Sequence, residues 1–257
     1  MIEPSLPLSG WAVISLRDAR QNTALRRAVR RAGGTLLAVP GFRLRAIDDA
    51  RARADLAAAL AAPVCLFVSP AAVRYAARLQ PLADYPGMAL APGPGTASAL
   101  RRAGVTRVDW PRRELRSEGI LALPALNPPP ACVGQVAAPG GRELFGRVLG
   151  ERGVRLFRAE VYRREPCVLT ARQRQTVQAL RGPYALLLSS LEAFEQVLGQ
   201  LADDIARLRA AVVVAASARL ADAAAAHGFG RIVTAPSARP AALITTLITH
   251  AKPMGFR

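Results

Sequence analysis

The sequence predicts an α/β protein with two doubly wound domains, each built on a parallel β-sheet that helices cover. Two observations lead to this prediction. Short apolar segments alternate with helix-like segments along all 257 residues, and such alternation favours parallel strands joined by right-handed crossovers. In addition, parts of the first half of the chain recur in the second half. A chain of this length allows one large or two medium domains.

Strands are expected where a short apolar segment stands between turn-forming residues. Residues 63–68 are almost continuously apolar, which is typical of a strand buried on both faces of a sheet. The predicted strands are 11–16, 35–39, 43–47, 63–68, 87–91, 106–109, 133–137, 154–162, 184–188, 211–215 and 231–234.

Helices are expected between these strands, with recognisable signals at their ends. Ser69-Pro70 is an N-cap followed by proline at the first helical position, and Asp48-Asp49 can cap the helix before it. Gly33-Gly34 ends the first helix. The predicted helices are 22–32, 48–61, 69–79, 93–104, a short one from 116, 143–151, 171–180, 190–202, 218–227 and 239–250.

An internal duplication relates the two halves of the chain and predicts two similar domains. The matching pairs are 67–70 with 187–190, 96–108 with 220–232, and 12–34 with 133–153. Judged by composition alone, the proline-rich run 127–130 looks like the boundary between the domains.

The chain is strongly basic. It has 35 lysine and arginine residues against 18 acidic ones, a net charge of +17, and Lys252 is its only lysine. An arginine-rich genome would produce this bias without functional meaning. The functional explanation is a field that attracts a polyanion, either a nucleic acid or a small molecule with many carboxylates. The arginines are scattered over many predicted helices without interleaved aromatic residues, which disfavours a nucleic-acid groove.

The cysteines and the N-terminus bear on the cellular compartment. Cys65, Cys132 and Cys167 are odd in number and far apart, so we expect a reduced, cytoplasmic protein without disulfide bonds or a metal site. No apolar run approaches the roughly 18 residues that a membrane helix needs. The first residues carry no basic stretch before an apolar one, and we therefore expect no signal peptide.

Polar residues stand in the loops that follow the predicted strands, where open parallel sheets bind their ligands. The candidates for ligand binding are Arg17, Ser69, Thr96, Ser189, Ser217 and Arg219. Most of them lie at a helix start, where free backbone N–H groups and the positive end of the helix dipole suit a carboxylate or a phosphate. For any single serine or threonine, ordinary N-capping is the competing explanation.

Common catalytic and cofactor motifs are missing from the sequence. Residues 93–98 have Ser98 in place of the third glycine of a dinucleotide fingerprint, and no Walker lysine motif exists. His227 and His250, the only histidines, fall on separate predicted helices, which disfavours a metal site or a histidine-based triad. An enzyme with this sequence would work without a metal, a nucleotide or an activated nucleophile, by holding a reactive anion in one shape.

Tyr162 stands beside Arg163 and Arg164 at the junction of two similar halves. A phenol next to two guanidiniums at such a junction favours a ligand-binding cleft. The alternative is an amphipathic strand end with a half-buried tyrosine.

Together, these segments resemble the uroporphyrinogen-III synthase family over nearly the whole chain. Each matching motif is weak alone, but their order and spacing are fairly specific. The motifs are Leu16-Arg17, LFVSPAAV at 66–73, GPGTA at 93–97 with Leu100 and Gly104, SEGIL at 117–121, Gly141-Arg142 with Leu144 and Leu149, and VYRR at 161–164.

The resemblance implies two flavodoxin-like domains joined by a two-stranded linker, with the active site in the inter-domain cleft. The first domain is then discontinuous, residues 1–38 and 166–257, and the second is 42–160, with linker strands near 38–42 and 160–166. This arrangement replaces the boundary that composition indicates at 127–130, and it implies that Tyr162 lies at the hinge and faces the cleft.

The implied reaction is the closure of linear hydroxymethylbilane to uroporphyrinogen III, with inversion of the terminal pyrrole ring and loss of water, in tetrapyrrole biosynthesis. The substrate carries eight carboxylates, which the positive charge of the chain suits. We expect a monomeric lyase without cofactor or metal. Our hypothesis is that Tyr162 is catalytic and donates a proton or a hydrogen bond to the departing hydroxyl. The residues expected to hold acetate and propionate groups are Arg17, Ser69, Thr96, Ser189, Ser217 and Arg219.

Two other functions are compatible with the sequence. A non-enzymatic two-domain binding protein for a polycarboxylate or another small anion would share the fold and the capped loops. A basic nucleic-acid-binding module would explain the charge, but the sequence lacks the patches and stacking residues of such modules.

Overall fold

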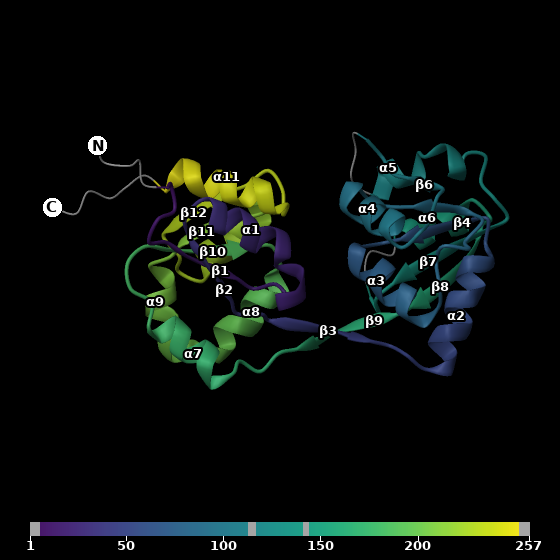
Figure 1. The fold of residues 1–257 in the computed structure, drawn as a ribbon. Helices are drawn as coiled ribbons and strands as arrows, with labels where there is room; N and C mark the ends of the chain where they lie inside the picture. Colours follow the sequence, from purple (N-terminus) through teal and green to yellow (C-terminus); the bar gives the residue numbers. More distant parts are fainter. Residues whose placement is uncertain (1–5, 113–116, 141–143, 252–257) are drawn as a thin grey trace. The chain divides into compact units, whose positions relative to one another are not determined.

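The computed structural model of the chain describes residues 6–112, 117–140 and 144–251, and it is an α/β fold with two parallel sheets (Figure 1). The chain divides into two compact units. Unit 1 consists of Met1–Arg43 and Glu165–Arg257, and unit 2 is Leu44–Arg164. Three predicted features lie outside the described residues, namely the helix start at Arg116, the motif Gly141-Arg142 and the helix start at Glu143.

Unit 1 contains a five-stranded parallel sheet in the order β12-β11-β10-β1-β2. Its strands are β1 (Ala12–Ser15), β2 (Thr35–Ala38), β10 (Tyr184–Leu188), β11 (Val212–Ala215) and β12 (Arg231–Thr234). Its helices are α1 (Thr23–Arg31), α7 (Ala171–Gln178), α8 (Leu191–Gln200), α9 (Ile205–Arg209), α10 (Ala218–Ala226) and α11 (Pro240–His250). Along β11, Val213 packs with Phe194 of α8, whereas Val212 and Val214 pack with Leu243 of α11. Both faces of the sheet are therefore buried, as its apolar strands require.

Unit 2 contains a second five-stranded parallel sheet, in the order β6-β5-β4-β7-β8. Its strands are β4 (Val64–Phe67), β5 (Met88–Leu90), β6 (Val108–Asp109), β7 (Cys132–Ala137) and β8 (Arg155–Glu160). Its helices are α2 (Ala50–Ala61), α3 (Pro70–Leu79), α4 (Pro94–Arg102), α5 (Ser117–Leu121) and α6 (Leu144–Glu151). Leu56, Ala72 and Leu100 bring α2, α3 and α4 to one core, and Ile120 and Phe145 bring α5 and α6 to the other.

The two sheets have the same strand order once the chain is permuted. The pair β1 and β2 takes the place of β7 and β8, and β10, β11 and β12 take the places of β4, β5 and β6. Each unit therefore combines one segment from the first repeat of the sequence with one segment from the second. The proline-rich run 127–130 lies between the two sequence repeats but inside unit 2, which is why composition indicates a boundary there that the structure does not have.

A two-stranded sheet of β3 (Phe42–Ala46) and β9 (Tyr162–Pro166) carries the chain from unit 1 to unit 2 and back. Gly41 stands directly before β3 and is held by two backbone hydrogen bonds. The N–H of Gly41 donates to the oxygen of Leu16 at 3.2 Å, and the oxygen of Gly41 accepts from the N–H of Cys167 at 2.9 Å. A Cβ on Gly41 would lie 2.5 Å from the backbone oxygen of Ala193. Only glycine fits this position without a shift of the backbone.

Two predictions about elements are wrong. The expected strand 154–162 is two strands, because β8 ends at Glu160 and β9 begins at Tyr162. Between them Val161 donates its N–H to the oxygen of Ala137 and accepts from the N–H of Ile47, so the chain changes sheets there. The second error is the omission of α9, which follows a 3-10 turn, Ala202–Asp204.

No helix within the described residues has both the length and the apolar character needed to cross a membrane.

Candidate active site

Tyr162 is buried at the start of β9, and two contacts hold its phenol. Only 5% of the residue is exposed. Its hydroxyl lies 3.1 Å from the hydroxyl of Ser69, and either oxygen can be the donor. Its ring stacks on the ring of Tyr75, with centroids 5.4 Å apart and an angle of 15° between the planes. The direction of the phenol within unit 2 is therefore fixed.

Ser69 is the N-cap of α3 and places the positive end of that helix beside Tyr162. Its hydroxyl oxygen accepts from the N–H of Ala72 at 3.0 Å, and Pro70 is the first helical residue. A serine hydroxyl has one proton and two lone pairs, so Ser69 can accept from Ala72 and still donate to Tyr162. In that arrangement the phenol proton of Tyr162 is free to point at a ligand.

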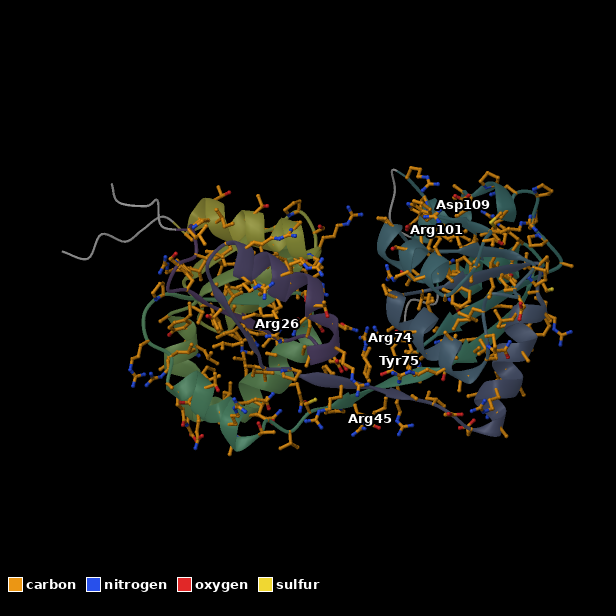
Figure 2. The ribbon with its side chains drawn as sticks, viewed as in Figure 1. Arg26, Arg45, Arg74, Tyr75, Arg101 and Asp109 are labelled. Atoms are coloured by element: carbon orange, nitrogen blue, oxygen red, sulfur yellow. The ribbon has the colours of Figure 1, made fainter. Side chains whose placement is uncertain are left out.

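Tyr75, Arg74 and Arg78 belong to the same cluster, although none of them is among the residues predicted from the sequence. Tyr75 is buried, and its hydroxyl donates to the backbone oxygen of Leu44 at 2.7 Å. The guanidinium carbons of Arg74 and Arg78 lie 5.7 and 5.2 Å from the centre of the Tyr75 ring, within the range of a cation–π interaction. Figure 2 shows Arg74 and Tyr75 together on α3. The sequence does carry a signal for this cluster. Shortly after the Ser69 cap, two arginines stand four residues apart, and one of them is next to a tyrosine.

Thr96 lies in the first turn of α4 and is only 3% exposed. A Cβ on Gly95 would come 4.0 Å from Cγ of Pro70, so the first turns of α3 and α4 approach each other. The first N–H groups of a helix have no partner within the helix. Pro70 and Pro94 have no N–H, and the N–H of Ala72 already binds Ser69, so the N–H groups left for a ligand are those of Ala71, Gly95 and Thr96. These two adjacent helix starts lie at the carboxyl edge of the unit 2 sheet, the edge from which Tyr162 also comes.

In unit 1, Arg17 follows β1 and contacts Ser189, which follows β10. Nε of Arg17 donates to the hydroxyl of Ser189 at 3.1 Å, and Nη2 donates to the backbone oxygen of Ala238. Burial lowers the pKa of the Arg17 guanidinium, because a charged group loses hydration in a protein interior. An anionic partner would compensate this loss, and the guanidinium has further N–H groups to offer one.

Two buried polar residues that were not predicted from the sequence hold the Arg17 loop. Ser15 and Asn22 are 1% and 0% exposed, and the Ser15 hydroxyl donates to Oδ1 of Asn22 at 2.9 Å. The backbone N–H of Arg17 donates to the Ser15 hydroxyl, and the Arg17 oxygen accepts from Nδ2 of Asn22, both at 3.4 Å. A serine as the last residue of an otherwise apolar strand is the available sequence signal.

The remaining predicted residues lie at two helix starts of unit 1. Ser217 precedes α10 in the N-cap position, but its side chain makes no capping hydrogen bond. Arg219 is the second residue of α10 and is exposed. At α8 the N-cap is Ser190, whose hydroxyl accepts from the N–H of Ala193 at 3.3 Å, so Ser189 is one residue before the cap and is free to contact Arg17.

The predicted residues thus form two sets. In unit 2 the structure joins Ser69 to Tyr162, with Thr96 at the neighbouring helix start. In unit 1 it joins Arg17 to Ser189, with Ser217 and Arg219 at the start of α10.

The other reactive groups of the described residues offer little chemistry. Within the described ranges, no group of three or more His, Cys, Asp or Glu side chains could hold a metal ion. Cys65, Cys132 and Cys167 form no disulfide bond. Burial raises the pKa of the Cys65 thiol, so this residue stays protonated near neutral pH and is a poor nucleophile.

Comparisons with known proteins give one consistent result. The family model described as uroporphyrinogen-III synthase HemD matches residues 23–245. A search of curated proteins gives no significant match.

Two solved structures share the fold. Uroporphyrinogen-III synthetase from Helicobacter pylori aligns with a TM-score of 0.61 and 14% identity, over 93% of this chain and 99% of that chain. A mutant uroporphyrinogen III synthase from Thermus thermophilus aligns with a TM-score of 0.54 and 18% identity, over 93% of this chain and 98% of that chain. At these identities the likeness is evidence for the fold.

Proposed function

The chain belongs to the uroporphyrinogen-III synthase family, and from this premise we propose how its residues carry out the family's reaction. That reaction closes linear hydroxymethylbilane to uroporphyrinogen III, with inversion of the terminal pyrrole ring and loss of water. The protein is therefore a cyclising hydro-lyase of porphyrin biosynthesis.

The substrate's own reactivity makes few demands on catalytic side chains. Its hydroxyl leaves readily from an electron-rich pyrrole, which produces a cationic azafulvene, and unaided closure gives the uninverted type I isomer. The protein has to bind the chain in the geometry that leads through the spiro route, and to stabilise the charges that develop. A site made of helix starts, arginines and one phenol suits this task.

Tyr162 is the residue to which we assign the departing hydroxyl. The observation that supports this role is the hydrogen bond between Tyr162 and Ser69 at the start of α3. With Ser69 as donor, the phenol proton can bind the hydroxyl as it leaves, and the positive end of α3 favours the negative charge that develops there. The equivalent position of unit 1 is Pro40, because Val39 and Val161 make the same bonds to the last residues of β1 and β7. Only one of the two units therefore has a phenol at this position.

The carboxylates of the substrate are assigned to the two sets of polar residues. In unit 2, backbone N–H groups in the first turns of α3 and α4, beside Ser69 and Thr96, donate hydrogen bonds to acetate or propionate groups. In unit 1, Arg17 and Ser189 bind further carboxylates, together with Ser217 and Arg219 at the start of α10. The uncapped hydroxyl of Ser217 supports its part in this binding. The net charge of +17 attracts the eight carboxylates over a longer distance.

A product assay tests the function directly. The protein is incubated with freshly generated hydroxymethylbilane, the products are oxidised to porphyrins, and the isomers are separated by chromatography. We expect the type III isomer in excess, and the type I isomer in the control without protein. Only type I product in both reactions would contradict the assigned function.

We also propose that the protein works in the cytoplasm as a monomer and does not bind nucleic acid. Three cysteines that form no disulfide bond support a reducing compartment. The scattered arginines support a small polyanion over a nucleic acid as the partner. Light scattering during size-exclusion chromatography measures the mass and so tests the monomer. A DNA retardation assay at low salt tests whether the protein binds nucleic acid.

A further inference from the structure

Tyr75 occupies a position in unit 2 that the proposed mechanism leaves without a role. It lies on α3, six residues after Ser69, and only 2% of it is exposed. Its ring is stacked on Tyr162, so the two phenols share one buried contact at the start of β9. A buried tyrosine usually finds a partner for its hydroxyl, and the partner of Tyr75 is informative.

The hydroxyl of Tyr75 donates to the backbone oxygen of Leu44 in β3. Its ring contacts Tyr162 in β9. One side chain of α3 therefore touches both strands of the two-stranded sheet, one by a hydrogen bond and the other by a ring stack. Because both ends of the Tyr75 side chain are fixed, its ring is a rigid surface against which Tyr162 lies.

Two cations restrain the same ring. The guanidinium carbons of Arg74 and Arg78 lie 5.7 and 5.2 Å from its centre. Cation–π attraction opposes any rotation that would move the ring away from the two guanidiniums. The two guanidiniums therefore support the stack with Tyr162 through the Tyr75 ring.

We propose that Tyr75 is a positioning residue that fixes the phenol of Tyr162, an inference that rests on the catalytic role assigned to Tyr162. The hydroxyl of Tyr162 is directed by Ser69 and its ring plane by Tyr75. A reacting group that is displaced by about 1 Å can lose about 10²-fold in rate. Without the Tyr75 ring, Tyr162 keeps its hydrogen-bond partner but gains freedom to tilt, and the rate of the type III reaction falls while substrate binding is kept.

Replacement of Tyr75 by Met, Leu or Phe tests the proposal. Tyr75→Met retains much of the apolar volume with a flexible chain but removes the flat ring, and we expect kcat for type III formation to fall about tenfold with KM nearly unchanged. Tyr75→Leu should behave similarly. Tyr75→Phe keeps the stack and loses only the bond to Leu44, so it should recover most of the wild-type kcat.

Tyr85 provides the matched control. It is buried in the same unit, with 5% exposed, and its hydroxyl donates to the oxygen of Ala62 at 2.9 Å. Tyr85→Leu should lower the thermal midpoint of unfolding as Tyr75→Leu does, and leave kcat unchanged when measured well below that midpoint. An equal loss of kcat in the two variants would reduce Tyr75 to a structural residue and overturn the proposal.

A double mutant separates positioning through Tyr162 from a general effect. In the background of Tyr162→Phe the catalytic hydroxyl is absent, so Tyr75→Met should cause little further loss of kcat. A full tenfold loss in that background, or wild-type kcat for Tyr75→Met alone, would refute the proposal. Failure of the wild-type protein to form type III product would instead refute the assigned function.

Discussion

At the scale of single residues, the best-supported contact is the one between Ser69 and Tyr162. The Ser69 hydroxyl has two partners, the N–H of Ala72 and the phenol of Tyr162. The first bond stabilises α3 and the second directs the group that we assign to catalysis. Loss of the hydroxyl should therefore be visible in both stability and activity.

Ser69→Ala should lower the free energy of unfolding by about 1 kcal/mol, the usual cost of a lost N-cap, and also lower kcat. Thr170→Ala is the matched variant, because Thr170 caps α7 through a hydroxyl that accepts from the N–H of Gln173 at 3.2 Å. We expect a similar loss of stability and an unchanged kcat. Chemical denaturation and steady-state kinetics measure the two effects. Equal kcat values for the two variants would show that the Ser69 hydroxyl does not direct Tyr162 in the reaction.

The residues that the sequence reveals are those with a local signal. Ser69 and Pro70 together predict a helix start, and α3 begins at Pro70 with Ser69 as its N-cap. Ser15, Asn22 and Tyr75 act through partners that are distant in the sequence or on another element, such as the Tyr75 bond to Leu44. No sequence spacing indicates that two such residues are in contact, so these contacts can be identified only from the folded structure.

At the scale of elements, the turn before β3 is tightly restricted by its neighbours. Gly41 donates to Leu16 and accepts from Cys167, and its Cα faces the backbone of Ala193 in α8. The sequence predicts most helices and strands, because their apolar periods and caps are local. The local apolar pattern misses the change of sheet at Val161, because β8 and β9 are both extended and continuous in sequence, and only their hydrogen-bond partners differ. A linker strand near 160–166 is implied by the family resemblance alone.

Gly41→Ala should destabilise unit 1 by about 1–3 kcal/mol, as overpacking commonly does, because the new Cβ would meet the Ala193 backbone at 2.5 Å. Gly199→Ala provides the contrast, since a Cβ there meets nothing within 4 Å and the residue is within α8. That variant should be stabilised by about 0.5–1 kcal/mol. Thermal unfolding of both variants measures the difference. An unchanged stability of Gly41→Ala would show that the turn can move to accommodate the new Cβ.

At the scale of the whole molecule, the sequence repeats and the folded units do not coincide. Unit 1 combines strands from 12–38 with strands from 184–234, and unit 2 combines strands from 64–109 with strands from 132–160. The duplication predicts two similar domains, but it cannot tell which repeat segments pair, because both repeats contain short apolar strands of the same kind. The domain limits 1–38 with 166–257, and 42–160, stay a prediction that the division of the chain near Leu44 and Arg164 supports.

Unit 2 is one continuous segment with two buried clusters of its own. We therefore expect residues 44–164, expressed alone, to fold and to unfold cooperatively. Circular dichroism during heating and the dispersion of amide signals in NMR spectra test this. A fragment without a cooperative transition would mean that unit 2 depends on the rest of the chain.

The phenol of Tyr162 is the group on which the proposed mechanism depends, and a single-turnover experiment tests it most directly. Protein in excess is mixed with hydroxymethylbilane, and the formation of uroporphyrinogen III is followed for the wild type and for Tyr162→Phe, which keeps the ring but loses the hydroxyl. We expect the rate to fall by about 10²-fold, the lower range for loss of a positioned acid, with a growing share of type I product. A wild-type rate for Tyr162→Phe would exclude the phenol from the reaction.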